Sequence, residues 1–225
     1  MKNIGMVVAV EIQAVLNKYA NYIEEIEISG YNVRKYSTEK YNLYITHSGV
    51  GEIAAAAATQ FLITQFSVDL IVNFGVVGGL TPEMSVAKTC IVESVVHYDI
   101  DTSTVDNCEI GRYLNYPSIY IPTTKTLVDL AMEICPTLKR VVCASGDKFI
   151  ADKEKKECMN NKFNADICEM EAAGIVLTSN RNKIPCLLIK TVSDSISGGE
   201  SEFRKEINNS AEICLDITDK IINGL

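Results

Sequence analysis

The sequence predicts a single α/β domain, residues 1–225, in which a mixed central β-sheet is flanked by helices. Two observations carry this prediction. Short apolar runs that suit buried strands alternate along the chain with segments whose apolar residues recur every three or four positions, as on one face of a helix. The length of 225 residues suits one α/β domain, and no linker, repeat or low-complexity tract divides it.

The first half of the chain opens with a run that is apolar on both faces and ends with a long strand. Between them, apolar and polar residues alternate on either side of a turn signal at Ser29-Gly30, which predicts a hairpin. Glycines then precede an alanine-rich helix. Gly75 to Gly79 is predicted to be a glycine-rich turn after a buried strand. The expected elements are a strand at 4–10, a helix from 11, a hairpin in 27–47, a helix at 54–66 and strands at 68–74 and 88–98.

The second half begins with an irregular stretch at 102–122 and then resumes the alternation of helix and strand. The final segment is amphipathic, which predicts a helix that packs one face on the sheet. The expected elements are helices at 123–135 and 152–162, strands at 140–144 and 166–169, a helix ending at 179, a strand at 185–192 and a helix at 201–223.

Composition narrows the class of partner. Apolar residues make up 47% of the chain and charged residues 22%, and a net charge of −8 is spread without blocks, which argues against a nucleic-acid partner. No apolar run reaches the length of a membrane span. The eight cysteines form no CxxC pair, and the two histidines, His47 and His97, make no zinc pattern. We therefore expect a cytoplasmic protein with reduced thiols, no metal and a small-molecule ligand.

In open α/β sheets, ligands gather at the carboxyl ends of strands. Each polar or glycine-rich segment at such an end is a weak signal alone. Asp147 and Asp194 are equally suited to cap a helix, and Glu171 is equally suited to lie in contact with solvent in the first turn of a helix. The segments in question are Glu11–Gln13, Gly75–Gly79, Ser145–Asp147, Glu169–Glu171 and Ser193–Asp194.

Their combination is more specific. The run EMEAAGI at 169–175, followed by TVSD at 191–194, resembles the signature of the nucleoside phosphorylase/nucleosidase superfamily. SGD at 145–147 is similar to the base-pocket segment of that superfamily, and SGVG at 48–51 and NFGVVGG at 73–79 follow in the expected order. The resemblance covers nearly the whole chain and is strongest to the methylthioadenosine/S-adenosylhomocysteine nucleosidases.

The resemblance implies a role for each matching residue, with a purine nucleoside as ligand. Asp194 matches the acid that protonates the purine N7, and Ser193 matches its orienting neighbour. Glu171 matches the carboxylate that accepts hydrogen bonds from the ribose hydroxyls, Met170 packs against the sugar, and Phe149 stacks on the base. The remaining residues that the resemblance places at the site are Ile150, whose backbone reads the adenine edge, and Val50, Val77, Gly78 and Glu169.

The choice of nucleophile separates hydrolases from phosphorylases in this superfamily. The loop Ala9–Gln13 has no arginine to hold a phosphate, and Lys190 matches an arginine that nucleosidases also carry. Water is therefore the expected nucleophile. Aligned on Gly5 without a gap, Gln13 falls at the position of the glutamate that activates water, while a one-gap alignment lets Glu11 take that role.

The sequence also differs from the family pattern at positions expected near the 5′-substituent of the nucleoside. Val76 stands where nucleosidases often have serine, and the segment 105–117, which in the homodimers of the family lines the partner's 5′ pocket, offers Tyr113 and Tyr116 as its aromatic residues. We expect a homodimer on the same ground, and no cofactor.

Three hypotheses remain open at this stage. The first is hydrolysis of the N-glycosidic bond of methylthioadenosine, S-adenosylhomocysteine or a relative, which releases adenine. The second is a phosphate-dependent purine nucleoside phosphorylase. The third is a nucleoside-binding protein that has lost its water-activating base at Gln13.

Overall fold

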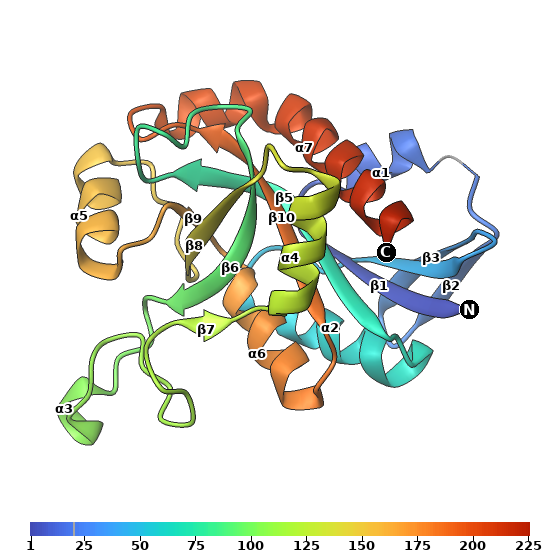
Figure 1. Ribbon diagram of the computed structural model, residues 1–225, viewed down its shortest axis with the longest axis horizontal. Coiled ribbons are helices and arrows are strands. Elements are labelled where there is room, and N and C mark those ends of the chain that lie inside the picture. Colours follow the sequence, from blue (N-terminus) through green and yellow to red (C-terminus); the bar gives the residue numbers. More distant parts are fainter. Residues whose placement is uncertain (20) are drawn as a thin grey trace.

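The computed structural model describes residues 1–19 and 21–225 (Figure 1). Strands and helices alternate in the order expected from the sequence. The strands are β1 (Lys2–Val8), β2 (Glu24–Ile28), β3 (Tyr31–Ser37), β4 (Tyr41–His47), β5 (Leu70–Gly79), β6 (Thr89–His97), β7 (Ile121–Pro122), β8 (Lys139–Ser145), β9 (Ile167–Glu169) and β10 (Cys186–Asp194). The helices are α1 (Ile12–Lys18), α2 (Glu52–Phe66), α3 (Ser103–Asp106), α4 (Lys125–Ile134), α5 (Lys153–Phe163), α6 (Ala172–Asn182) and α7 (Gly199–Gly224).

The strands form one mixed sheet, as predicted. Its order is β10-β6-β8-β9-β5-β1-β4-β3-β2, with β7 beside β6. The pairs β1–β4, β1–β5, β5–β10, β6–β8 and β8–β9 are parallel, and the others are antiparallel. Because β10 pairs with both β5 and β6, the strands β5, β9, β8, β6 and β10 close into a ring that alternation alone does not predict.

Helices cover both faces of the sheet (Figure 1). On one face α1, α4 and α7 pack on β5 and β10 around Phe74, Leu187 and Leu215, which are buried. On the other face α2 and α6 pack together over Ile71 and Leu188. Both faces of β5 and β10 are therefore buried, which explains why these strands read as continuous apolar runs.

The expected glycine-rich turn after β5 is wrong, because β5 runs through Gly75 to Gly79 as regular strand. Its pairing continues to the end, with Gly78 opposite Asp194 on β10 and Gly79 opposite Ile167 on β9. The glycines are needed for close approach rather than for a turn. A Cβ on Gly79 would lie 2.0 Å from the Met84 carbonyl oxygen, and one on Gly75 would lie 2.9 Å from Glu11 Oε1.

The hairpin predicted in 27–47 is present as β2 and β3, joined at Ser29 and Gly30, and the same stretch also supplies β4. The stretch predicted to be irregular holds only the short elements α3 and β7. Six of the eight cysteines are buried, all as free thiols. Within the described residues, no helix is long and apolar enough to cross a membrane.

Candidate active site

A pocket of about 290 Å³ opens at the carboxyl ends of β1, β5, β9 and β10. The strands β1, β5 and β10 are parallel and so end at the same edge, while β9, which is antiparallel to β5, pairs with the last two residues of β5 and reaches the same place. The pocket is lined by Val10, Glu11, Val50, Val76, Val77, Gly78, Phe149, Cys168, Glu169, Met170, Glu171, Ser193, Asp194 and Phe203. It therefore unites the predicted site residues, with the exception of Gln13 and Ile150.

Ile150 lies in a small adjoining cavity of about 30 Å³, which shares Phe149, Met170 and Asp194 with the main pocket. Phe149 is 47% exposed, and its ring meets Phe203 edge-on with 5.1 Å between centroids. Phe203 comes from α7, far away in sequence, so the alignment of motifs gave no signal for it. The two rings form one wall of the pocket.

Glu11 points into the pocket from the junction of β1 and α1. Its Oε1 accepts a hydrogen bond of 2.8 Å from the Val76 N–H, and its Oε2 accepts one of 3.0 Å from the Val10 N–H. The side chain is only 5% exposed, and this burial raises the pKa of the carboxyl, against the opposing effects of the Val76 N–H and the Lys190 ammonium. Glu11 is thus a buried, fixed carboxylate with its proton affinity increased.

Gln13 does not occupy the position that the gapless alignment assigns to it. Because α1 begins at Ile12, Gln13 already lies on the helix, where its side chain is exposed and donates to Asn17 Oδ1 at 2.9 Å. It lines a neighbouring cleft of about 130 Å³ between α1 and α7, which shares Val10 and Glu11 with the main pocket. Of the two residues that the alignments offered, Glu11 lines the pocket, as the one-gap alignment expects, and Gln13 does not.

Asp194 and Ser193 end β10, where the pairing with β5 shifts register between Val192 and Asp194. Such an irregularity re-aims side chains at the end of a strand. Ser193 Oγ lies 2.9 Å from Asp194 Oδ1 and 3.2 Å from the Val77 carbonyl oxygen. Lys156 on α5, which the sequence analysis missed, forms an ion pair of 2.6 Å with Asp194 Oδ2. Both oxygens of the Asp194 carboxylate are therefore held.

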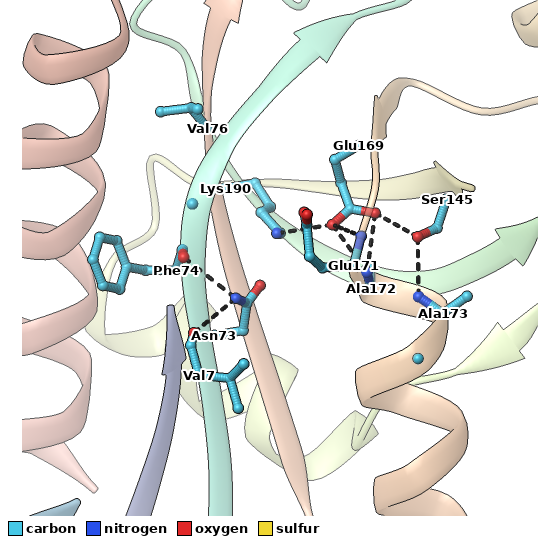
Figure 2. Close-up of polar contacts among 12 residues, drawn as sticks. Val7, Asn73, Phe74, Val76, Ser145, Glu169, Glu171, Ala172, Ala173 and Lys190 are labelled. Carbon is cyan, nitrogen blue, oxygen red and sulfur yellow. Dashed lines mark hydrogen bonds and ion pairs between the residues drawn. The ribbon is translucent and has the colours of Figure 1, made fainter. Parts of the chain in front are cut away.

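Glu169 organises the floor of the site (Figure 2). Its carboxylate accepts hydrogen bonds from the backbone N–H groups of Glu171 and Ala172 at the start of α6, and from Lys190 Nζ at 3.1 Å. Burial lowers the pKa of Lys190, but Glu169 and then Glu171 raise it above its usual value. Figure 2 shows Glu169 between Lys190 and Ser145, and these protein groups hold its carboxylate at the edge of the pocket.

Glu171 is held from the opposite side, where its Oε1 accepts a hydrogen bond of 3.0 Å from the Gly51 N–H. Burial, and then the nearby Glu169 carboxylate, raise the pKa of Glu171 to about 7. Asp147, which follows β8, accepts from the Glu52 N–H at 2.8 Å, so it caps the start of α2. Of the two carboxylates, only Glu171 lines the pocket.

A second group that the sequence analysis missed is Glu52, which is 7% exposed behind Glu169. Ser145 Oγ lies in hydrogen-bond contact with both the Glu52 and Glu169 carboxyl groups, and one hydroxyl proton cannot serve both. Burial, and then the Glu169 charge, raise the pKa of Glu52 to about 8. At neutral pH Glu52 is thus a carboxylic acid that donates to Ser145, which in turn donates to Glu169.

This buried acid predicts a pH dependence of stability. The folded-state pKa of Glu52 is about 8 and the ordinary value is 4.5, so its stabilising contribution is complete below pH 4.5 and is lost as pH rises through 8. We expect the free energy of unfolding to fall over this range, with about 1–3 kcal/mol of the fall due to Glu52, and Glu52→Gln to remove that share while the share of Glu171, whose pKa is also raised, stays. Urea unfolding at pH 5 and pH 8 measures both, and parallel losses in wild type and variant would contradict the assignment.

Tyr113 and Tyr116, offered by the sequence for the 5′ pocket, line a different cavity. It has about 400 Å³, lies against α6, and includes Asn180 and Arg181. Tyr113 Oη also lies 2.7 Å from His97 Nδ1. This cavity is larger but carries no carboxylate among its lining residues in the described chain, whereas the pocket at the strand ends carries four.

Comparison with known proteins agrees with the fold and the motifs. The family model of the phosphorylase superfamily matches residues 3–223. A 5′-methylthioadenosine/S-adenosylhomocysteine nucleosidase of Halalkalibacterium halodurans is 31% identical over 234 residues, covering 98% of this chain and 100% of that protein. An aminodeoxyfutalosine nucleosidase of Campylobacter jejuni is 28% identical over 224 residues, covering 96% and 95%.

Among solved structures, futalosine hydrolase of Helicobacter pylori superposes with a TM-score of 0.93 at 26% identity, covering 100% of this chain and 98% of that one. Sequence and structure thus agree over the full length of the described chain. The protein is a member of the phosphorylase superfamily and, within it, of the methylthioadenosine/S-adenosylhomocysteine nucleosidase family of N-glycosyl hydrolases.

Proposed function

We propose that this protein hydrolyses the N-glycosidic bond of a purine nucleoside with water as the nucleophile and Glu11 as the general base. The observation that carries the proposal is the meeting of Glu11, Glu171 and Asp194 in one pocket, each from a different strand end. Bond cleavage leaves positive charge on the ribose and electrons on the purine. An acid, a base and a ribose-binding carboxylate are the groups that this reaction requires.

Asp194 serves as the acid in this proposal. Proton transfer to the purine N7 makes the base a neutral leaving group, and the electrons of the broken C1′–N9 bond flow into the purine ring. Ser193 and Lys156 hold the two carboxylate oxygens, so the acid is fixed before substrate arrives. Phe149, against Phe203, offers an aromatic face for the base.

Glu11 serves as the base that takes the proton of the attacking water. Two backbone N–H groups fix its carboxylate, and the raised pKa makes it a stronger base than an exposed glutamate. Glu171 accepts hydrogen bonds from the ribose hydroxyls and places a negative charge beside the cationic sugar. Such fixed charges are worth most in a buried site.

Water is favoured over phosphate by the charge of the pocket. Four lining residues carry carboxyl groups, Glu11, Glu169, Glu171 and Asp194, and among the described residues no lysine or arginine lines it. The adjacent Lys190 is paired with Glu169. A phosphate dianion would meet carboxylates without a free cation, which disfavours the phosphorylase alternative.

The 5′-substituent faces an apolar wall of the pocket in this proposal. Val10, Val50 and Phe203 line the pocket together, and Val50 is 53% exposed, which leaves room for a substituent to extend outward. A methylthio group suits such a wall, so 5′-methylthioadenosine is the first candidate substrate. Aminodeoxyfutalosine is the second, because relatives named for its cleavage match this chain about as well as those named for methylthioadenosine.

The test is product analysis of the purified protein with methylthioadenosine, S-adenosylhomocysteine and aminodeoxyfutalosine, each with and without phosphate. Free adenine and a free sugar, at rates that phosphate does not change, support hydrolysis, and the ratio of kcat/KM values ranks the substrates. Formation of a sugar 1-phosphate that depends strictly on phosphate would replace the proposal with phosphorolysis. Nucleoside binding without turnover would favour a binding protein.

Replacement of Gln13 separates the Glu11 assignment from the base-deficient alternative. Because Gln13 lies on α1 outside the pocket, we expect Gln13→Glu to change kcat/KM by less than about threefold, as surface substitutions usually do. If Gln13 stood at the position of the base, a glutamate there would raise activity about tenfold or more. Steady-state adenine release from wild type and variant decides between the two.

A further inference from the structure

Lys156 is a fully buried lysine outside the substrate pocket. It lies on α5, a helix that is otherwise mostly polar and exposed, with 0% of its side chain accessible. Its ammonium has three acceptors, namely Asp194 Oδ2 at 2.6 Å, the Ser195 carbonyl oxygen at 2.8 Å and the Asp194 carbonyl oxygen at 3.5 Å. All three N–H groups are thus directed at the end of β10.

Stability alone does not account for this pair. Lysine is almost never fully buried unless it is paired, and a buried ion pair is often no more stabilising than apolar side chains of similar volume. The neighbouring Met159 and Phe163 of α5 show that apolar residues fill this interface. Lys156 pairs with the carboxylate of Asp194, which is the acid in the proposed function.

We propose that Lys156 is a positioning residue for Asp194, which fixes the acid and stabilises the carboxylate that proton donation leaves behind; the proposal rests on the acid role assigned above. In the step concerned, the proton moves from Asp194 to the purine N7. The C1′–N9 bond breaks with its electron pair going to the base. Asp194 becomes an anion whose Oδ2 faces the Lys156 ammonium, and the lysine keeps its protons throughout.

The same contact sets the balance of charge around the acid. A cation beside a carboxylate stabilises the anion that proton donation leaves, and Lys156 Nζ lies 2.6 Å from Asp194 Oδ2. The other groups near Asp194 are Ser193 on its own strand, Cys168 and Glu169 on β9, and Glu202 of α7, which binds Ser195. Lys156 is the cation among these described neighbours.

This contact gives the lysine a kinetic signature that a structural role lacks. Without the ammonium, proton donation is less favourable, so kcat is expected to fall about 10- to 100-fold, part of the usual benefit of acid catalysis. Lys156 does not line the substrate pocket, so KM is expected to stay within about threefold of wild type. A lower kcat with an unchanged KM is therefore the expected result.

The experiment compares Lys156→Met with Lys156→Arg and with Lys155→Met, which removes an exposed lysine one position away. Lys156→Met should lose kcat with KM unchanged, Lys156→Arg should recover most of that loss, and Lys155→Met should match wild type. An unchanged kcat in Lys156→Met overturns the proposal. So does a loss that Lys156→Arg does not recover, or one that appears in KM rather than in kcat.

Adenine binding gives a reading that does not depend on turnover. We expect adenine affinity, measured by calorimetry at the pH of maximal activity, to stay within about threefold of wild type in Lys156→Met, because the lysine lies outside the pocket. Adenine binding that falls as far as kcat overturns the proposal, because the site itself is then disrupted. If wild type binds adenine but hydrolyses no nucleoside, the proposed function fails, whereas failure of the positioning role alone leaves wild-type hydrolysis intact.

Discussion

Asp194→Asn is expected to reduce kcat for adenine release by about 10²- to 10⁴-fold, the usual contribution of a general acid. Asparagine has nearly the shape of aspartate, and its amide oxygen can still accept a hydrogen bond from Lys156, whose Nζ lies 2.6 Å from Asp194 Oδ2. What it lacks is a proton of suitable acidity for the purine N7. Steady-state release of adenine, followed at the pH of maximal wild-type activity, measures the loss.

A loss of fold must be separated from a loss of acid in this experiment. The matched control is Asp216→Asn, which neutralises an exposed carboxylate on α7 that forms a surface ion pair with Lys18. We expect this control to stay within about threefold of wild type, because surface ion pairs contribute little. Thermal melting of Asp194→Asn tests the fold directly. Near-wild-type kcat in a well-folded Asp194→Asn would remove Asp194 from the chemistry.

Glu11→Gln is expected to lower kcat by a similar factor of about 10²- to 10⁴-fold. Glutamine keeps an oxygen for the Val76 N–H but cannot accept a proton from water. Its amide also places an N–H group where the Val10 N–H now donates, so a small loss of stability accompanies the loss of the base. Nucleoside affinity should change far less than kcat, because water rather than ribose is the partner of Glu11.

The control for this variant is Glu212→Gln, an exposed carboxylate in the cleft that also contains Gln13. It should behave as wild type. Wild-type kcat/KM should decline on the acid side at a pH above the ordinary range of glutamate, because burial raises the pKa of Glu11 and brings that of Glu171 to about 7. Activity requires both ionised, so it falls as pH falls. An acidic limb near pH 4.5 would contradict these assignments.

Local sequence was sufficient to locate most of the pocket. Ser193 and Asp194 end the long, mostly apolar strand β10, which is parallel to β5, and Glu171 follows the short strand β9, which pairs with the end of β5. The motif spacing identified the same residues through family resemblance. The order of helices and strands followed from hydrophobic periodicity, which depends only on neighbours along the chain.

Contacts between residues far apart in the sequence could not be predicted from local sequence patterns. Lys156 reads as one charge in the polar run KEKKE, yet it is buried because α5 packs its inner face against the end of β10. Glu52 reads as the first-turn glutamate of a helix, yet it lies beside Ser145 and the Gly174 N–H, 93 and 122 positions away. No periodicity marks such partners, since a charge is stabilised in the interior only by groups from other elements.

The segment after β1 shows the division most clearly. By itself the sequence determined that this segment holds Glu11 and Gln13 two positions apart, that the domain is α/β with a mixed sheet, and that the motifs at 169–175 and 191–194 belong to the superfamily. Only the tertiary structure showed which of Glu11 and Gln13 lines the pocket. The choice depends on the residue at which α1 begins, because a shift of two positions on a helix turns a side chain by more than half a turn, from the pocket to solvent.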